Sequence, residues 1–342
     1  MSNLTKNNEI SSFSICSTLL SLRKRKKSSM KQQINQVKSL AFVGGTHGNE
    51  LTGVHLVPWL DKYFNEISSL IDIKTLIANP KAIKINKRYT EKDLNRCFSL
   101  IDLNRDSNEL LDKDMAEDWE FARAREINQT LGPKDSELNT DFIVDIHNTT
   151  ANMGASLIIG AMDEYLFYLC HELLKLDHRV KVYYMPEDRM NSPYLPSIAK
   201  RDLCLEMGPQ SPGLLRADLF ELGKTLSKSI VSFTEIWNQG QYQKEDVSLP
   251  HYRQFKNLDY PRDKNGRICG MIHPKLQDQD YNEFNEDTQS FFVDFEQNDI
   301  PAGVTGNFNP VFINEQAYYE KGIAMSLTRF RTLSWENWSD NE

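Results

Sequence analysis

Three features are scarce in this sequence, and each scarcity excludes a class of protein. No apolar run approaches the roughly 20 residues that a membrane-spanning helix requires, so we expect no membrane span. Positive charge is in deficit, since the formal net charge is −8, which argues against a general nucleic-acid binder. Cysteine is rare: the five residues include no C-x-x-C pair, which argues against a zinc ribbon and predicts free thiols in a reducing cytoplasm.

The N-terminal segment differs from the rest of the chain. Residues 1–38 hold eight Lys and Arg against one acid, a net charge of +7, which leaves −15 for the remainder. We therefore expect residues 1–37 to be a disordered basic extension. Met30 directly precedes the globular pattern, so residues 1–29 are either a start-site extension or inert tail, or a segment for targeting or docking.

Between residues 38 and 239, short apolar runs alternate with segments of helical periodicity. This alternation predicts an α/β fold with a mostly parallel or mixed sheet and helices on both of its faces. The expected strands are SLAFVGG, IDIKTLIANP, DFIVDIHNTT, ASLIIGA, RVKVYYM and DLCLEMG. The expected helices are ELTGVHLVPWLDKYF, residues 112–130, residues 164–175 and about 216–237.

After residue 239 the helical periodicity disappears. Short runs such as GMIHP, SFFVDF and PVFINE are separated by Pro, Gly and Asn turns. We expect a smaller β-rich C-terminal domain, residues 240–342, packed against the catalytic α/β domain of residues 38–239. A chain of 342 residues suits two domains of unequal size.

The stretch VGGTHGNELTG places His47 and Glu50 three residues apart in a glycine-rich turn after the first strand. This is a metal-ligand spacing, and we expect the glycines to clear space for an ion and its water. His147 ends the third strand and Glu206 ends a later one, and ligands of open α/β sheets bind where strands end. Two imidazoles and one carboxylate leave one position open on a tetrahedral ion, which is typical of catalytic zinc. Asp145, on the same side of its strand as His147, is a candidate acceptor for an imidazole N–H.

Weaker interpretations remain open at this point. H-x-x-E alone is a poor predictor of a metal site, and His147 alone could be a buried histidine with satisfied hydrogen bonds. Arg88, Asn95 and Arg96 lie in NKRYTEKDLNRCF, which is either a solvated loop or a site where arginine receives a carboxylate and polarises a carbonyl. The other histidines have no comparable setting, and we expect them at the surface or in packing: His55, His171, His178, His251 and His273.

Longer motifs follow one another in an order typical of one family. They are GGTHGNELTG, DLNR, GPKDSE, DIHNTTANMG, SIAK, LEMGPQ, GLLRADL, YPRD, HPKLQDQD and VFINEQAYYEK. From about residue 38 to 325 the chain resembles the succinylglutamate desuccinylase/aspartoacylase family. The resemblance implies a zinc carboxypeptidase-like fold and one Zn²⁺ per subunit, and it makes a homodimer plausible.

The resemblance also assigns roles to single residues. It implies zinc on His47, Glu50 and His147, with Glu206 as general base and then general acid. Arg88 would stabilise the oxyanion at the scissile carbonyl. The substrate would be held by Asn95, Arg96, Asn148 and Tyr318, the last from the C-terminal domain, which would then cover the active site.

The implied reaction is hydrolysis of an N-acyl-L-aspartate to a carboxylate and L-aspartate, with no nucleic-acid or membrane partner. One departure concerns the substrate: Pro196 stands directly before SIAK, where the resemblance leads us to expect an arginine for the side-chain carboxylate. Arg189, Lys200 and Arg201 are the nearby cations that could replace it.

Three rival functions remain. The first is the same chemistry on neutral or aromatic N-acyl amino acids. The second is a peptidase, which a domain covering the pocket argues against. The third is an inactive binding protein, which has no use for a general base at Glu206.

Overall fold

The computed structural model describes residues 36–104 and 118–340. Residues 1–35 of the basic extension expected at 1–37, and the first six residues of the helix expected at 112–130, lie outside the described residues. The described residues from Lys38 onwards form one compact unit. Among the described residues, no helix is both long enough and apolar enough to cross a membrane.

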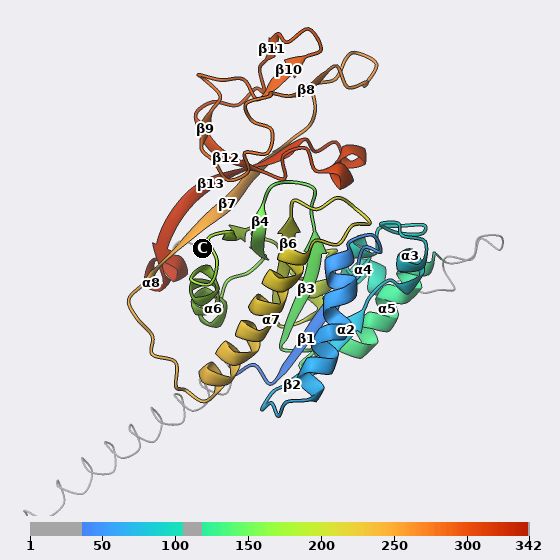
Figure 1. The fold of residues 1–342 in the computed structure, drawn as a ribbon, viewed down its shortest axis with the longest axis vertical. Helices are drawn as coiled ribbons and strands as arrows, with labels where there is room; N and C mark the ends of the chain where they lie inside the picture. Colours follow the sequence, from blue (N-terminus) through green and yellow to red (C-terminus); the bar gives the residue numbers. More distant parts are fainter. Residues whose placement is uncertain (1–35, 105–117, 341–342) are drawn as a thin grey trace, which may run out of the picture. The chain divides into compact units, whose positions relative to one another are not determined.

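A sheet of ten strands runs through this unit in the order β2-β1-β3-β6-β4-β5-β7-β13-β12-β9 (Figure 1). Its first six strands are β1 Ser39–Gly44, β2 Asp72–Ile77, β3 Phe142–Asn148, β4 Gly154–Ile159, β5 Val180–Tyr184 and β6 Arg201–Gly208. β2, β1, β3 and β6 are parallel neighbours, whereas β4 is antiparallel to β6 and parallel to β5. The sheet is therefore mixed, one of the two arrangements that the sequence left open.

Helices cover both faces of the parallel strands. α2, α6 and α7 pack together on one face, where the ring of Phe42 in β1 stacks on Phe64 of α2 at 5.9 Å. Ala41 and Val43 point to the opposite face, into a core shared with α4, α5, η1 and η2. The helical bounds are α2 Leu51–Asn65, α3 Pro80–Lys84, η1 Leu94–Arg96, α4 Leu100–Leu103, α5 Trp119–Leu131, α6 Glu164–Leu174, η2 Leu195–Ile198 and α7 Ala217–Asn238.

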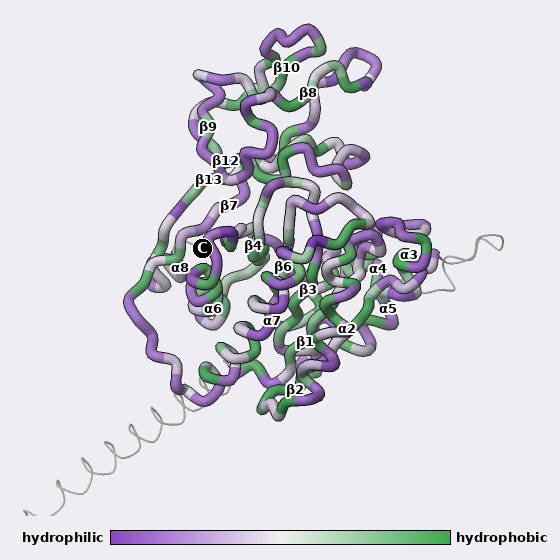
Figure 2. The backbone as a smooth tube through the Cα atoms, viewed as in Figure 1, coloured by the Kyte–Doolittle hydropathy of each residue, from purple (hydrophilic) through white to green (hydrophobic). Residues whose placement is uncertain are grey.

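The C-terminal part is built from short strands and one long antiparallel pair, β7 and β13. Its elements are β7 Ser248–Leu258, β8 Gly270–Ile272, β9 Phe284–Asn285, β10 Phe292–Asp294, β11 Asp299–Ile300, β12 Asn307–Val311, η3 Gln316–Lys321, β13 Met325–Ser334 and α8 Trp335–Asp340. β7 pairs with β5 and β13, so the main sheet continues into this part. Figure 2 shows hydrophobic residues concentrated along β1 and β3, and more hydrophilic residues in the segments around β8 and β10.

Two details differ from the sequence-based expectation. The strand expected at PVFINE ends at Val311, because Phe312 and Asn314 adopt positive φ angles of 52° and 60°, which break an extended chain. β7 and β13 were not predicted. Their exposed and buried residues do not alternate regularly, so they carry no clear period of two.

Candidate active site

His47, Glu50 and His147 meet at the ends of β1 and β3. The three residues are buried, and one potential ligand atom from each lies within 4.8 Å of the others. Nδ1 of His47 is 2.7 Å from Oε1 of Glu50, and Nδ1 of His147 is 2.8 Å from Oε2. The two Nδ1 atoms are 3.2 Å apart. Ligands at about 2.0–2.1 Å from a tetrahedral Zn²⁺ are separated by about 3.3 Å, so this triad fits a small metal ion.

The far nitrogen of each imidazole faces a buried carboxylate. Nε2 of His147 is 2.8 Å from Asp145, the acceptor expected from the sequence, and Nε2 of His47 is 2.9 Å from Asp93. Such carboxylates fix the tautomer and orientation of metal-binding histidines. The sequence analysis missed Asp93. The signal was present in DLNR, since Asp93 lies two residues before Asn95.

Asp93 also holds two cations beside the triad. It accepts hydrogen bonds from Arg88 at 3.3 Å and from Nζ of Lys321 at 3.0 Å. Burial by itself raises the pKa of Asp93, but His47, Arg88 and Lys321 outweigh burial and hold that pKa well below its usual range. Asp93 therefore remains a carboxylate and links the predicted ligand His47 to the predicted oxyanion-stabilising group Arg88.

The glycines of the turn have a different role from the expected one. A Cβ on Gly44 would lie 2.4 Å from the carbonyl oxygen of Gly53, and one on Gly48 would lie 2.2 Å from the backbone of Ala82. Gly45 has a φ of 66°. The glycines thus allow close approach of the turn to the neighbouring helices rather than clearing space for an ion.

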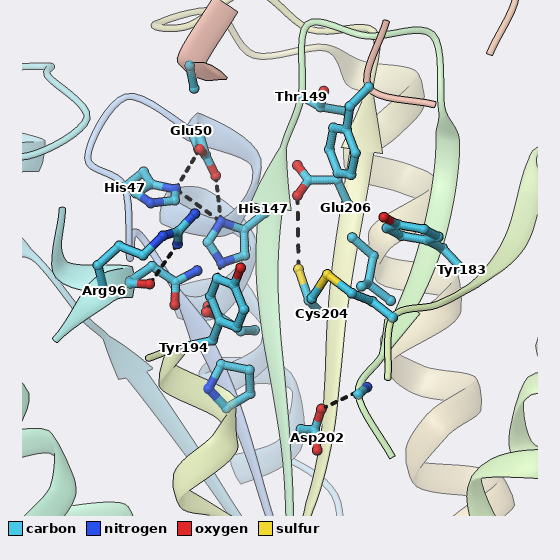
Figure 3. Close-up of a pocket in the computed structure, with 18 of the residues that line it drawn as sticks. His47, Glu50, Arg96, His147, Thr149, Tyr183, Tyr194, Asp202, Cys204 and Glu206 are labelled. Carbon is cyan, nitrogen blue, oxygen red and sulfur yellow. Dashed lines mark hydrogen bonds and ion pairs between the residues drawn. The ribbon is translucent and has the colours of Figure 1, made fainter. Parts of the chain in front are cut away.

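The triad lines one pocket together with Glu206 (Figure 3). Glu206 pairs with His147 across β3 and β6. Burial raises the pKa of Glu206 to about 8, and the negative charges of Glu50 and Glu315 act in the same direction. Glu50 shifts the other way, because the two histidines outweigh its burial and lower its pKa.

The predicted substrate-binding residues line the same pocket, although their surroundings differ. Arg88 donates to Glu50 at 3.1 Å, which places its guanidinium beside the triad. Arg96 lies over the ring of Tyr194 at 4.6 Å. Tyr318 comes from η3, in the C-terminal part.

Asn148 is engaged with the framework. Its Oδ1 accepts hydrogen bonds from the backbone of Thr52 at 3.0 Å and from Gln210 at 2.8 Å, while its Nδ2 donates to the carbonyl of Met207 at 3.1 Å. Its backbone N–H donates to Glu50 at 3.0 Å. A substrate could use only the remaining hydrogen of the Asn148 amide, so its predicted contact with substrate is the least supported by geometry.

Comparison with known proteins gives two family matches in succession. Residues 36–234 match the succinylglutamate desuccinylase/aspartoacylase catalytic domain, and residues 247–330 match the AstE/AspA barrel-sandwich hybrid domain. The chain belongs to the succinylglutamate desuccinylase/aspartoacylase family. The predicted family, the mixed α/β fold with its β-rich C-terminal part and the class of hydrolase are therefore confirmed.

Named relatives fall into two groups. A probable aspartoacylase of Trichodesmium erythraeum is 38% identical over 88% of this chain and 99% of its own length. The aspartoacylase of Mus musculus is 38% identical, covering 87% of this chain and 94% of its own. A human N-acyl-aromatic-L-amino acid amidohydrolase is also 38% identical, covering 87% and 92%. The crystal structure of murine aminoacylase 3 superposes with a TM-score of 0.79 at 34% identity, over 88% of this chain and 97% of that one.

The cations proposed as replacements at Pro196 have other partners. Pro196 itself lines the pocket, whereas Arg189, Lys200 and Arg201 do not. Nη1 of Arg189 donates to the backbone carbonyl of Lys200, and Nζ of Lys200 lies 2.9 Å from Asp141. Arg201 pairs with Asp163. The structure therefore does not support Arg189, Lys200 or Arg201 as the replacement for the missing arginine.

The sequence analysis also missed Glu315. Its carboxylate accepts hydrogen bonds from the backbone of Thr150 at 2.7 Å and from the hydroxyl of Thr149, and both Glu315 and Thr149 line the pocket. This contact ties the C-terminal part to the loop after β3. Glu315 and Thr149 lie in the motifs VFINEQAYYEK and DIHNTTANMG, but their contact was not predicted because the two residues are 166 positions apart.

Replacement of His147 by alanine is expected to abolish tight metal binding, because one of the three predicted ligand atoms is lost. Elemental analysis should find about one zinc per chain in the wild type and little in His147→Ala. His178→Ala, at a histidine whose side chain is 92% exposed, is the matched control and should keep its zinc. Full zinc content in His147→Ala would remove His147 from the ligand set.

Asp93→Asn is expected to weaken zinc binding roughly 10–100-fold, because the amide cannot hold the N–H of His47 with a charged acceptor. The dissociation constant can be measured by competition with a chelator. Asp72→Asn, at a residue whose side chain is 65% exposed, makes the same chemical change away from the site and should have no effect. Equal zinc affinity in Asp93→Asn and wild type would show that Asp93 does not support the metal.

Proposed function

We propose that this chain is a zinc-dependent hydrolase that cleaves N-acyl-L-aspartate into a carboxylate and L-aspartate. The observation that carries the reaction type is the buried triad of His47, Glu50 and His147 in the same pocket as Glu206. The substrate is supported by the relatives named aspartoacylase and by two guanidiniums that line the pocket, Arg88 and Arg96.

The donor set favours zinc among the available ions. Two imidazole nitrogens and one carboxylate oxygen, with a fourth position free, are the ligands of catalytic zinc in hydrolases. When bound, zinc supplies Lewis acidity and a nucleophilic water at neutral pH. His47, Glu50 and His147 would hold one ion per chain, and Asp93 and Asp145 would orient the two imidazoles.

Glu206 is proposed to move the proton. As a general base it accepts a proton from the attacking water, and as a general acid it donates that proton to the departing amide nitrogen. Its position in β6, opposite His147 in β3, brings it to the metal side of the pocket.

Arg88 and Arg96 are proposed to receive negative charge. Arg88, held by Glu50 and Asp93, is oriented to donate to the carbonyl oxygen as charge develops there. Arg96, with Asn95 and Tyr318, would bind the α-carboxylate of the amino acid, for which a guanidinium provides two parallel donors. Asn148 would contribute at most one further donor.

Hydrolysis of neutral or aromatic N-acyl amino acids is the alternative. Pro196 provides no cation, and Ile158, Tyr183 and Met185 add apolar surface to the same pocket. The human relative named for aromatic substrates is as similar to this chain as the murine aspartoacylase. Substrate choice therefore depends on whether Arg88 and Arg96 outweigh the missing charge at Pro196.

Four predictions about domains, location and assembly remain proposals. They are a catalytic domain of residues 38–239, a C-terminal domain of residues 240–342 that covers the site, a cytoplasmic location and a homodimer. Glu315 and two residues of η3, Ala317 and Tyr318, line the pocket, which supports the proposal that the C-terminal domain covers the active site. The proposed ligand is a small N-acyl amino acid.

Glu206→Gln preserves shape and removes the proton-accepting group. It should retain zinc and lose roughly 10²-fold or more in kcat, because general acid–base catalysis contributes about 10²–10⁴-fold. Glu221→Gln makes the same change at a side chain that is 66% exposed, and it should leave turnover unchanged. Near-normal turnover in Glu206→Gln would assign the proton transfer to another group.

The aspartate assignment is tested by the ratio of kcat/KM for N-acetyl-L-aspartate to that for N-acetyl-L-asparagine, a neutral isostere. We expect a ratio of at least roughly 10, about 1.4 kcal/mol, because the positive charges of Arg88 and Arg96 attract a side-chain carboxylate in the same pocket even though their hydrogen bonds go to the carbonyl and the α-carboxylate. Pro196→Arg should raise the ratio further by supplying the absent cation. A wild-type ratio near or below one would contradict the aspartate assignment and support the neutral or aromatic alternative.

A further inference from the structure

The pocket extends along β6 beyond Glu206. Asp202, Cys204 and Glu206 all line it, as Figure 3 shows, whereas Leu203 and Leu205 are buried on the opposite face of the strand. Four residues of a strand span about 13 Å, so Asp202 lies about that far from Glu206 along the pocket. We call this end, lined by Gly160, Glu187 and Asp202, the distal end.

The distal end carries two carboxylates, those of Asp202 and Glu187. A Cβ added to Gly160 would lie 3.3 Å from Oδ2 of Asp202 and 3.7 Å from Cβ of Glu187, so both acids flank this glycine. Oδ2 of Asp202 accepts a hydrogen bond from the backbone N–H of Gly160 at 3.3 Å, whereas Oδ1 is buried and has no hydrogen-bond partner among the described residues. Ser192 donates to one oxygen of Glu187 at 2.7 Å.

The cations near the distal end are directed elsewhere. Nη1 of Arg189 is 3.9 Å from Oδ1 of Asp202 and donates instead to the backbone carbonyl of Lys200. Nζ of Lys134 donates to the carbonyls of Phe98 and Ser192 and to the hydroxyl of Ser197. Neither Arg189 nor Lys134 lines the pocket. Burial raises the pKa of Asp202 and of Glu187, and it outweighs the lowering effect of Arg189 on Asp202 and of Arg96 and Lys134 on Glu187.

We propose that the site has a further activity, the deacylation of Nα-acyl-L-amino acids whose side chain ends in a cation, such as lysine or ornithine. This inference rests on the proposed deacylase function. The α-carboxylate would face Arg96 and the terminal ammonium would face Asp202 and Glu187. The amide C–N bond breaks, a C–O bond to water forms, and both protons of the water end on the released amine.

Length supports a long side chain. Hydrogen bonds of about 3 Å at Glu206 and at Asp202 leave about 7 Å between the amide nitrogen and a terminal cation. An extended chain advances about 1.25 Å per bond, so the six bonds from the amide nitrogen to Nζ of lysine cover about 7.5 Å. The side-chain carboxylate carbon of aspartate ends about 2.5 Å from its Cα and stops short of the distal end.

Charge supports a cation over a neutral group of equal length. A neutral side-chain terminus would exclude water from Asp202 and Glu187 and would not replace the hydrogen bonds of that water. An ammonium group donates up to three hydrogen bonds in their place. Charge-assisted hydrogen bonds of this kind correspond to about 10-fold or more in affinity.

The test compares Nα-acetyl-L-lysine with Nα-acetyl-L-norleucine, which keeps the aliphatic chain and lacks the ammonium. The zinc-loaded wild type should cleave the lysine compound at least about 10-fold better in kcat/KM. Asp202→Asn and Glu187→Gln should each reduce this ratio towards one by slowing the lysine compound only. Asp188→Asn, the same change one residue from Glu187 and outside the pocket lining, should keep the wild-type ratio.

Cleavage of the norleucine compound reports on folding and on the catalytic groups within each variant. Calorimetric binding of the two compounds to Glu206→Gln supplies a readout that does not require turnover, and it should show the same preference. If the wild type cleaves both compounds and kcat/KM for the lysine compound is no higher than for the norleucine compound, this inference is overturned and the proposed function stays intact. Failure of the zinc-loaded enzyme to cleave any N-acetyl amino acid overturns the proposed function itself.

Discussion

The parallel pairing of β1, β3 and β6 is the constraint on which the candidate site depends. Gly44 pairs with Ile146, so the turn after β1 begins beside His147, and His147 pairs with Glu206. Side chains alternate between the two faces of a strand, so a slip of one residue in either pairing would turn His147 or Glu206 away from the pocket. Helices on both faces bury these strands and leave one register compatible with the core.

The pocket uses neighbouring charges to give similar side chains different properties. Glu50 and Glu206 are both buried glutamates. Glu50 is flanked by two imidazoles and Arg88, and its pKa falls, whereas Glu206 is dominated by burial and its pKa rises. The first is suited to remain a ligand and the second to exchange a proton. Asp202 continues this pattern at the distal end, where burial outweighs the charge of Arg189 and raises the pKa.

The C-terminal part completes the pocket through long-range contacts. The sheet passes from β5 to β7 and on to β13, and the segment directly before β13 bears Glu315 and Tyr318. Glu315 fastens this loop to Thr149 and Thr150 after β3. The family matches divide at residues 234 and 247, yet the hydrogen-bonded sheet is continuous across that boundary.

The sequence by itself determined the central strands and helices, because apolar periodicity marks elements that bury one face, and it determined which residues end the strands. It therefore identified His47, Glu50, His147, Asp145 and Glu206 as neighbours. The tertiary structure decided what periodicity does not encode. Several contacts depend on side chains brought together from distant positions. They are the contact of Asp93 with His47, the hydrogen bonds of Asn148 to the backbone, the contact of Glu315 with Thr149 and Thr150, and the partners of Arg189. The direction of β4 and the pairing of β7 with β13 were likewise decided only in three dimensions, since strand partners are chosen by hydrogen bonding across the sheet rather than by local sequence.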